Sequence, residues 1–167
     1  MKTIDLIVYD FDGVMTNNKV FVSQDGKEFV FCNRDDGWAI QKIKERGFPQ
    51  LILSSEKNPV VMARALKLSI PCVSGCLDKK SWLIDFCMSK GYTLENVVYI
   101  GNGLNDLKIM RIVGVGIAPS DAHPDVIKIA DYVTKKRGGE GVILEFLEML
   151  KRGTISELYD LAKEKIK

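Results

Sequence analysis

The chain has 167 residues, of which 46% are hydrophobic and 28% charged, as in a globular protein with one domain of ordinary size. Its formal net charge of +2 is too small to indicate nucleic acid or a membrane surface as the main partner. No apolar run approaches the ~20 residues that span a bilayer. The first apolar run, residues 4–9, leads into acidic residues and does not resemble a signal peptide. We therefore expect a cytoplasmic protein.

The chain then alternates between patterns typical of strands and of helices. Residues 4–9 are a short apolar run typical of a buried strand. Asp25-Gly26 lies between two β-rich runs and predicts a hairpin over 19–32. The remaining strands are expected at 50–54, near Cys72, and at 97–100, 115–118 and 132–134. Helices are expected at 36–46, 59–68, 79–90, 104–112 and 141–150, with a short one after Pro124.

This alternation predicts an α/β fold with a doubly wound, mainly parallel sheet and helices on both faces. We expect a single domain over 1–167 that includes an amphipathic tail helix over about 154–167. Asp36 is interpreted as the N-cap of its own helix. The hairpin is expected to present an apolar face for packing, formed by Val20, Val22, Phe29 and Phe31.

The clearest chemical signal is the pair Asp10 and Asp12 at the end of the first strand. Residues two apart on a strand point to the same side, so both carboxylates can share one site. They repel each other unless a proton or a cation lies between them. Magnesium fits, because it binds one or two carboxylates together with phosphate oxygens. The alternative is a solvated turn after the strand.

Two other patterns are weaker. Cys72 and Cys76 have no second pair and no nearby histidine, so we expect reduced thiols here and not a zinc site. Gly101 and Gly103 match the first two glycines of a dinucleotide-binding motif, but Asp106 stands where that motif has its third glycine. We therefore do not expect a dinucleotide-binding site.

The ordered motifs resemble the haloacid dehalogenase superfamily and, within it, the small capless sugar-acid phosphatases. The similarity runs from about residue 2 to residue 150. It is carried by Asp10-Phe-Asp-Gly-Val, Ser54-Ser-Glu-Lys, Asp78-Lys, Gly101-Asn-Gly-Leu-Asn-Asp, Ala122-His-Pro, Ala130-Asp-Tyr-Val-Thr and Arg137-Gly-Gly-Glu-Gly. These phosphatases act on 2-keto-3-deoxyoctonate 8-phosphate, or on ketodeoxynononate and N-acylneuraminate 9-phosphates. A similar domain forms the C-terminal part of animal CMP-N-acylneuraminate synthetases.

The resemblance implies a magnesium-dependent phosphoric monoester hydrolase that works in two steps. Asp10 would attack phosphorus and form an aspartyl-phosphate. Asp12 would protonate the leaving oxygen and later deprotonate the attacking water. Ser54 and Lys79 would contact the transferring phosphoryl group. The implied metal ligands are the Asp10 carboxylate, the backbone carbonyl of Asp12 and the side chain of Asn102, supported by Asn105 and Asp106.

Asn102 departs from the family pattern, in which Gly101-Asn-Gly reads Gly-Asp-Asp and the first aspartate is a metal ligand. One lost charge is worth ~4 kcal/mol of gross Coulomb energy at an effective dielectric of about 20. Metal desolvation offsets part of this, so we expect magnesium affinity to be weaker by roughly 10- to 1000-fold. The animal synthetase domain is similar in having Asn here. An alternative is therefore a weakly active or inactive assembly module associated with an acylneuraminate cytidylyltransferase.

Four side chains are candidates for binding the sugar acid. Glu56 stands where octonate-phosphate phosphatases usually have Arg, and it resembles the nine-carbon enzymes. Arg64 or Lys67 could meet a substrate carboxylate, or both could form a solvated helix face. Arg137 lies where the family's C-terminal segment approaches the substrate. Ketodeoxynononate or N-acylneuraminate 9-phosphate, and hence sialic acid biosynthesis, is favoured over 2-keto-3-deoxyoctonate 8-phosphate.

In the family, hairpins associate to form a homotetramer, and neighbouring subunits cover the capless site and exclude water. The resemblance therefore implies a homotetramer here, with neither nucleic acid nor a membrane as partner.

Overall fold

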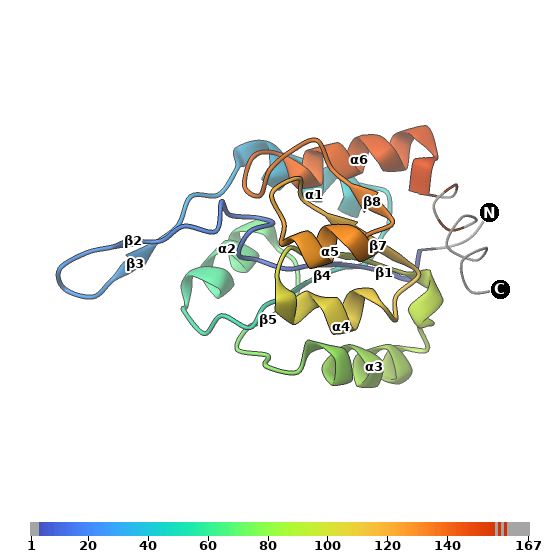
Figure 1. Ribbon diagram of the computed structural model, residues 1–167, viewed down its shortest axis with the longest axis horizontal. Helices are drawn as coiled ribbons and strands as arrows, with labels where there is room; N and C mark the ends of the chain where they lie inside the picture. Colours follow the sequence, from blue (N-terminus) through green and yellow to red (C-terminus); the bar gives the residue numbers. More distant parts are fainter. Residues whose placement is uncertain (1–3, 156, 158, 160–167) are drawn as a thin grey trace.

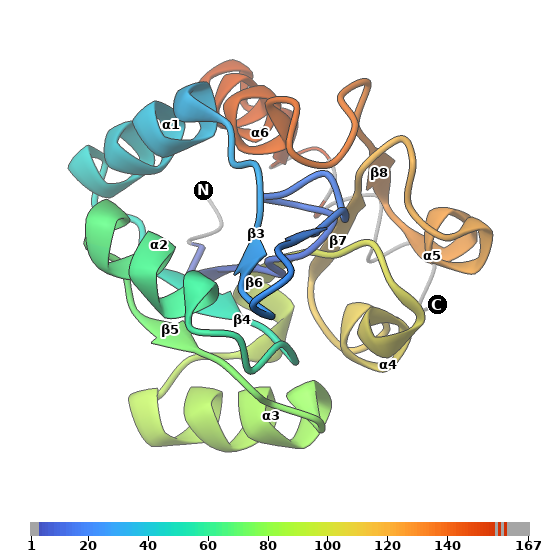
Figure 2. The ribbon, with the colours of Figure 1, turned by 90° about the vertical axis from the view of Figure 1, so that its left-hand side faces the viewer.

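The computed structural model describes residues 4–155, 157 and 159, which form a parallel sheet with helices on both faces (Figures 1 and 2). The six-stranded sheet has the order β5-β4-β1-β6-β7-β8. Its strands are β1 (Leu6–Tyr9), β4 (Gln50–Leu53), β5 (Cys72–Val73), β6 (Val97–Ile100), β7 (Val115–Ala118) and β8 (Tyr132–Val133). Neighbouring strands are parallel throughout. The predicted fold class is confirmed.

The central strands read as continuous apolar runs because both faces of the sheet are covered. Every residue of β1, β4, β6 and β7 is buried. In the register, Val8 of β1 lies between Leu51 of β4 and Tyr99 of β6. The strand that carries the Asp10 motif is therefore held in the middle of the sheet.

The helices lie in two layers. One face of the sheet packs against α1 (Arg34–Glu45), α2 (Val60–Leu68) and α6 (Val142–Arg152). The other face packs against α3 (Lys79–Lys90), α4 (Leu107–Met110) and α5 (Pro124–Ile129). Two 3₁₀ helices, η1 (Leu94–Asn96) and η2 (Leu104–Asp106), join these elements.

The strand order creates a switch point beside β1. The chain runs outward from β1 through β4 to β5 and then returns to β6, β7 and β8 on the other side of β1. Right-handed crossovers place the helices of these two halves on opposite faces. The connections therefore diverge beyond the carboxyl ends of β1 and β6, where ligands bind in open α/β sheets.

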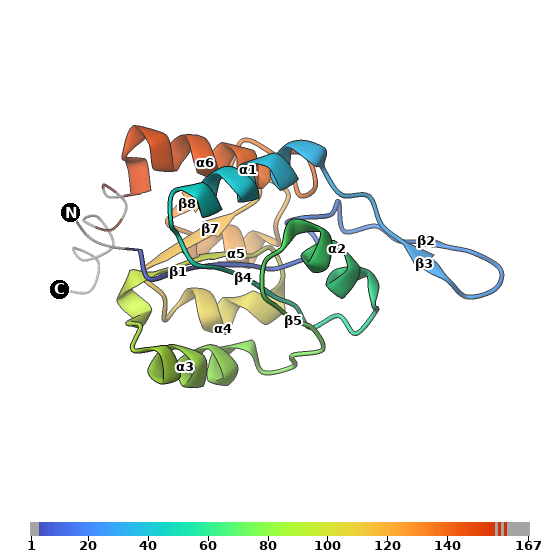
Figure 3. The same cartoon turned by 180° about the vertical axis from the view of Figure 1, so that it is seen from behind.

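The hairpin of β2 (Phe21–Val22) and β3 (Glu28–Phe29) projects from the body beyond β1 (Figures 1 and 3). Phe21 pairs with Phe29, and Val22 pairs with Glu28. Since paired residues share a face of the ladder, Val22 and Phe29 lie on opposite faces. The prediction of one face with Val20, Val22, Phe29 and Phe31 is therefore wrong, because the turn fixes a different register.

Two predicted helix features differ from the structure. The N-cap of α1 is Asn33, whose side chain accepts a hydrogen bond from the Asp35 amide at 2.7 Å. The prediction that Asp36 caps its own helix is wrong, because Asp36 accepts hydrogen bonds from amides of α6. The predicted helix over 104–112 is divided into η2 and α4, because the Asp106 side chain turns inward at their junction.

Most of the predicted tail helix over 154–167 lies outside the described residues. Within the described part of the chain, no helix is both long enough and apolar enough to cross a membrane.

Candidate active site

A cavity of about 280 Å³ opens beyond the carboxyl ends of β1, β4 and β6. These strands are neighbours and run parallel, so the loops that follow them meet at one edge of the sheet. The cavity is lined by Asp10, Asp12, Asn18, Ser54, Ser55, Glu56, Asn102, Gly103 and Asn105. Six of the candidates chosen from the sequence are therefore brought together.

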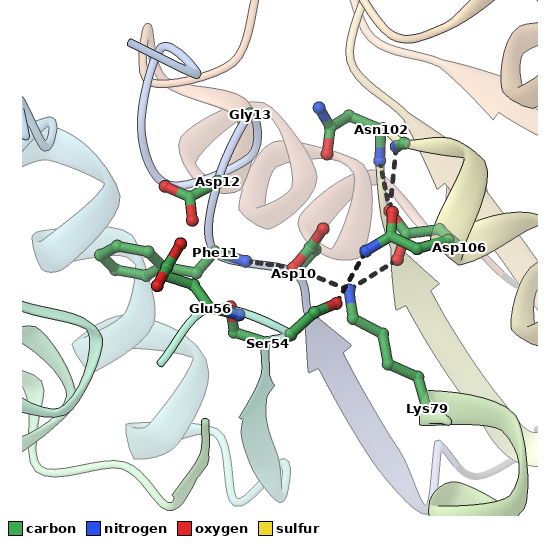
Figure 4. A network of polar contacts seen from close by, with 12 residues as sticks. Asp10, Phe11, Asp12, Gly13, Ser54, Glu56, Lys79, Asn102 and Asp106 are labelled. Atoms are coloured by element: carbon green, nitrogen blue, oxygen red, sulfur yellow. Dashed lines mark hydrogen bonds and ion pairs between the residues drawn. The ribbon is translucent and has the colours of Figure 1, made fainter. Parts of the chain in front are cut away.

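Lys79 lies directly behind this cavity. It is the first residue of α3 and only 2% exposed. Its Nζ lies 2.8 Å from Oδ1 of Asp10 and 2.8 Å from Oδ1 of Asp106 (Figure 4). Asp78 fixes the start of α3 by accepting a hydrogen bond from the Ser81 amide at 3.1 Å. One buried cation thus faces two buried carboxylates, so the cluster keeps a net negative charge when all three groups are ionised.

Asp106 ties the loop after β6 to this cluster. Its Oδ2 accepts hydrogen bonds from the amides of Asn102 (2.9 Å) and Gly103 (3.0 Å). Its Oδ1 accepts a hydrogen bond from the Tyr99 hydroxyl at 2.6 Å. Sequence analysis missed Tyr99, because the apolar run of β6 concealed a buried hydroxyl that needs a partner.

The two acids respond differently to Lys79. Burial is the main cause that raises the pKa of Asp10, and the charge of Asp106 adds to it, while Lys79 opposes both. Burial also disfavours ionisation of Asp106, but the charge and hydrogen bond of Lys79 outweigh it and leave the pKa of Asp106 below its usual range. Asp106 is therefore the more readily ionised of the two carboxyl groups.

The Asp10 carboxylate has one oxygen engaged and one directed into the site. Oδ1 accepts hydrogen bonds from the Phe11 amide at 2.7 Å and contacts Lys79. The other oxygen points to the side on which Asn102 lies (Figure 4). The fixed oxygen orients the carboxylate, and the other one is available to a ligand.

Asp12 lies on the opposite side of Asp10 from Lys79, near Glu56 (Figure 4). Burial raises the pKa of Asp12, and a 3.3 Å hydrogen bond from the Thr16 hydroxyl opposes this shift. A carboxyl that retains its proton more readily than usual suits the role of a general acid.

Gly13 lets Asn102 approach this loop. Gly13 has φ +81°, and an added Cβ would lie 1.9 Å from Nδ2 of Asn102. A side chain at position 13 would therefore be strained and would displace the amide. This close packing holds Asn102 beside the loop that carries Asp12.

The oxygen set fits magnesium. Asp10, Asp12 and Asn102 bring two carboxylates and one amide to the same cavity, and hard oxygen donors of this kind suit Mg²⁺. Among the described residues, no group of three or more His, Cys, Asp and Glu side chains could hold a metal ion. The side-chain ligands would therefore be Asp10 and Asn102, because the resemblance implies that Asp12 binds through its backbone carbonyl and keeps its carboxyl group for proton transfer.

The predicted substrate-binding residues are divided. Glu56 lines the cavity, and its Oε1 accepts hydrogen bonds from the amides of Lys57 (2.6 Å) and Asn58 (2.7 Å). Three others lie outside the cavity lining. Arg64 donates to the Asn33 carbonyl at 2.8 Å, Arg137 lies 3.4 Å from Asp121, and Lys67 is exposed on α2. Their role in substrate binding stays a prediction.

Two further polar residues line the cavity and were missed. Asn18 has φ +61°, which is uncommon for a residue other than glycine. Ser55 accepts a hydrogen bond from Nδ2 of Asn105 at 2.9 Å, which joins the loops after β4 and β6. Asn18 belongs to none of the motifs quoted above, whereas Ser55 lies within Ser54-Ser-Glu-Lys but was given no role of its own.

The chain is similar to known proteins over most of its length. A family model described as haloacid dehalogenase-like hydrolase matches residues 53–146, more than half of the chain. The 3-deoxy-D-manno-octulosonate 8-phosphate phosphatase KdsC of Escherichia coli K12 is 31% identical over 150 residues. That match covers 89% of this chain and 80% of the relative.

Solved structures are similar over most of their length. A HAD family hydrolase from Streptomyces avermitilis is 44% identical, with a TM-score of 0.82 and coverage of 84% of this chain and 80% of that one. The 3-deoxy-D-manno-octulosonate 8-phosphate phosphatase of Moraxella catarrhalis is 28% identical, with a TM-score of 0.87. The match covers 99% of this chain and 95% of that one, and that crystal structure contains a magnesium ion, a phosphate ion and KDO.

Replacing Lys79 by Met would leave Asp10 and Asp106 buried without a cation. We expect the free energy of unfolding at neutral pH to fall by about 3–5 kcal/mol. Lys79 opposes the burial that raises the pKa of Asp10, so without it the folded-state pKa of Asp10 would lie further above its unfolded value, and stability would be retained at acid pH and lost as pH rises. Urea unfolding at acid and neutral pH measures this, with Lys80→Met as control. An equal loss at both pH values would contradict the ion-pair account.

Proposed function

The chain belongs to the haloacid dehalogenase-like hydrolases, and we propose that it is a magnesium-dependent phosphatase of sugar-acid phosphates. The predicted family, and the predicted class of phosphoric monoester hydrolase, are confirmed. The observation that carries the proposal is the Lys79 bridge between Asp10 and Asp106 beside a cavity lined by further carboxylates. Relatives named for 3-deoxy-D-manno-octulosonate 8-phosphate support a sugar acid as the substrate class.

In the first proposed step, Asp10 attacks the phosphorus atom. Its free oxygen forms a bond to phosphorus, the bond from phosphorus to the sugar oxygen breaks, and Asp12 gives its proton to that oxygen. The contact of Oδ1 with Lys79 and the Phe11 amide fixes the direction of attack. The product is an aspartyl-phosphate and a free sugar acid.

In the second step, water attacks the same phosphorus atom. Asp12, now ionised, takes a proton from the water, and the bond from phosphorus to Asp10 breaks. Inorganic phosphate leaves, and both carboxyl groups return to their starting protonation states. Ser54, which is 1% exposed and lines the cavity, is placed to donate its hydroxyl to a phosphoryl oxygen.

Magnesium would be held by the Asp10 carboxylate, the backbone carbonyl of Asp12 and the side-chain oxygen of Asn102, and it would supply positive charge to the phosphoryl oxygens. Lys79 would add a positive charge beside Asp10. A phosphorylated sugar acid is strongly anionic, so binding it next to these carboxylates requires compensation of this kind.

For the substrate itself, we propose a nine-carbon sugar acid in preference to the eight-carbon one. Glu56 lines the cavity, and it can accept hydrogen bonds from sugar hydroxyls. We expect kcat/KM for ketodeoxynononate or N-acetylneuraminate 9-phosphate to exceed that for 2-keto-3-deoxyoctonate 8-phosphate by about tenfold or more. Phosphate release from all three measures this.

Glu56→Ala should remove that preference, whereas Glu95→Ala, an exposed change on η1, should leave it intact. A wild-type enzyme that prefers the eight-carbon substrate would contradict the role given to Glu56.

Asn102→Asp should restore a charged ligand. We expect its affinity for Mg²⁺ to exceed that of the wild type by roughly 10- to 1000-fold, because an added charge strengthens binding of the cation. Isothermal titration with MgCl₂ measures this without turnover. Asn105→Asp is the matched control, since Asn105 lines the same cavity but bonds to Ser55. An equal gain in both variants would show that net charge, and not ligation at position 102, is responsible.

The same variant distinguishes a second proposal, that the chain is an assembly module for an acylneuraminate cytidylyltransferase. Asn102 favours it, because the family phosphatases have a charged residue there. A wild type without turnover, together with an active Asn102→Asp variant, would support this second function.

We also propose that the chain forms a homotetramer through its hairpin. Phe21 and Phe29 are 63% and 53% exposed, and their ring centroids lie 6.0 Å apart on one face. Exposed aromatic clusters of this kind are typical of interaction surfaces. Light scattering should give a tetramer for the wild type and a smaller species for the Phe21→Ser, Phe29→Ser double variant. Leu66→Ser on α2 is the control, and a monomeric wild type would contradict the proposal.

A further inference from the structure

Helix α6 begins without a cap of its own. Its N-cap residue is Gly141, which has φ +104° and no side chain to accept a hydrogen bond. The cap comes instead from Asp36 on α1, whose Oδ1 accepts hydrogen bonds from the amides of Ile143 (2.9 Å) and Leu144 (3.0 Å). Residues more than 100 positions apart are thus joined at the point where α1 and α6 lie side by side (Figures 1 and 2).

Capping α6 in this way costs more desolvation free energy than a local cap would, because it buries a carboxylate. Asp36 is only 2% exposed, and its second oxygen, Oδ2, is buried without a hydrogen-bond partner in the described part of the chain. Burial raises the pKa of Asp36 to about 6, and hydrogen bonds from the α6 amides oppose that shift. A serine at the helix start would cap α6 without burying a carboxylate, so the cap from Asp36 carries a desolvation cost that a local cap would avoid.

The residues just before α6 form a strap, defined here as 137–141, that lies on the loop carrying Asp12. The Gly139 amide donates to the Val14 carbonyl at 3.0 Å. An added Cβ at Gly138 would lie 2.1 Å from the Gly13 carbonyl oxygen, and one at Gly139 would lie 2.6 Å from the Asn17 amide. The strap therefore touches the backbone of residues 13–17 directly and leaves no space between them.

Residues 13–17 belong to a loop that also contains Asp12, and residues 12–17 are called the acid loop here. Within it, Thr16 is fully buried, and its hydroxyl donates to Asp12 at 3.3 Å and accepts from the Gly13 amide. A shift of the loop backbone would move Thr16 and, with it, the carboxyl group of Asp12. The strap thus contacts the loop that carries Asp12 and continues directly into α6, and it is also held by Asp121, whose Oδ1 accepts a hydrogen bond from the Gly138 amide at 2.9 Å.

We propose that Asp36 is a positioning residue: by capping α6 from α1, it holds the strap on the acid loop and so orients the Asp12 carboxyl group. The catalytic consequence rests on the proposed phosphatase function, but the mechanical link does not. Asp36 itself does not line the cavity.

Hydrogen exchange at neutral pH tests the link without turnover. In Asp36→Ala we expect exchange to rise by about tenfold or more both in residues 137–144 and in residues 13–18, with the β6 amides unchanged. Asp35→Ala is the matched control, because Asp35 is exposed in the same first turn of α1. Faster exchange in 137–144 alone would overturn the proposal, and so would an equal rise in the Asp35→Ala variant or throughout the sheet.

Gly138→Ala provides a second, independent variant if Asp36→Ala does not fold. It pushes the strap off the loop while leaving the Asp36 cap in place. We expect faster exchange in 13–18 with Ile143 and Leu144 still protected, and continued protection of 13–18 would overturn the proposal.

Where the wild type releases phosphate, Asp36→Ala should lower kcat by about tenfold or more and change KM less than about twofold, because Asp12 acts in the chemical steps. A raised KM with unchanged kcat would contradict the positioning role. An inactive wild type would sink the proposed function but leave the exchange result intact.

Discussion

Lys79 joins three parts of the fold through one ammonium group. Its position is set by the first turn of α3, and it reaches the end of β1 through Asp10 and the loop after β6 through Asp106. An ammonium group excluded from water is stable only with anionic partners, and buried carboxylates need a cation in turn. The three residues therefore fix one another, and the cavity takes its shape from them. If Lys79 were displaced, Asp10 and the loop that carries Asn102 would no longer be held together through a shared ion-pair partner.

The charge balance of this cluster leads to the proposed chemistry. Two carboxylates share one ammonium, and Asp12 and Glu56 stand on the other side of the cavity. A phosphate ester cannot approach so much negative charge without a cation, so the proposed phosphoryl-transfer site requires the proposed magnesium site beside it. Asn102 removes one negative charge from that site relative to the family pattern. The absence of a side chain at Gly13 lets the Asn102 side-chain amide pack against that residue. Under the proposed mechanism, the chain would keep the nucleophile and the acid and would bind the metal more weakly.

Sequence analysis predicted much of this arrangement because its signals are local. Continuous apolar runs marked the buried strands, and polar residues after those strands marked the edge where Asp10, Ser54 and Asn102 meet. What it could not supply were partners distant in the chain. Asp36 was interpreted as a cap of α1, since nothing in its neighbourhood points to α6, 107 residues away. Tyr99 lay hidden in an apolar strand, and the face of the hairpin depended on a register that alternation alone does not fix.

The central claim is that Asp10 is the nucleophile. Its most direct test is borohydride trapping during turnover, because borohydride reduces an acyl phosphate on Asp10 to homoserine. The wild type, or Asn102→Asp if the wild type turns over too slowly, is mixed with sugar-acid phosphate and magnesium, quenched with borohydride, and mapped by peptide mass. We predict homoserine at position 10, dependent on both substrate and metal. Phosphate release with Asp10 unmodified, or a trapped group on another residue, would contradict the account.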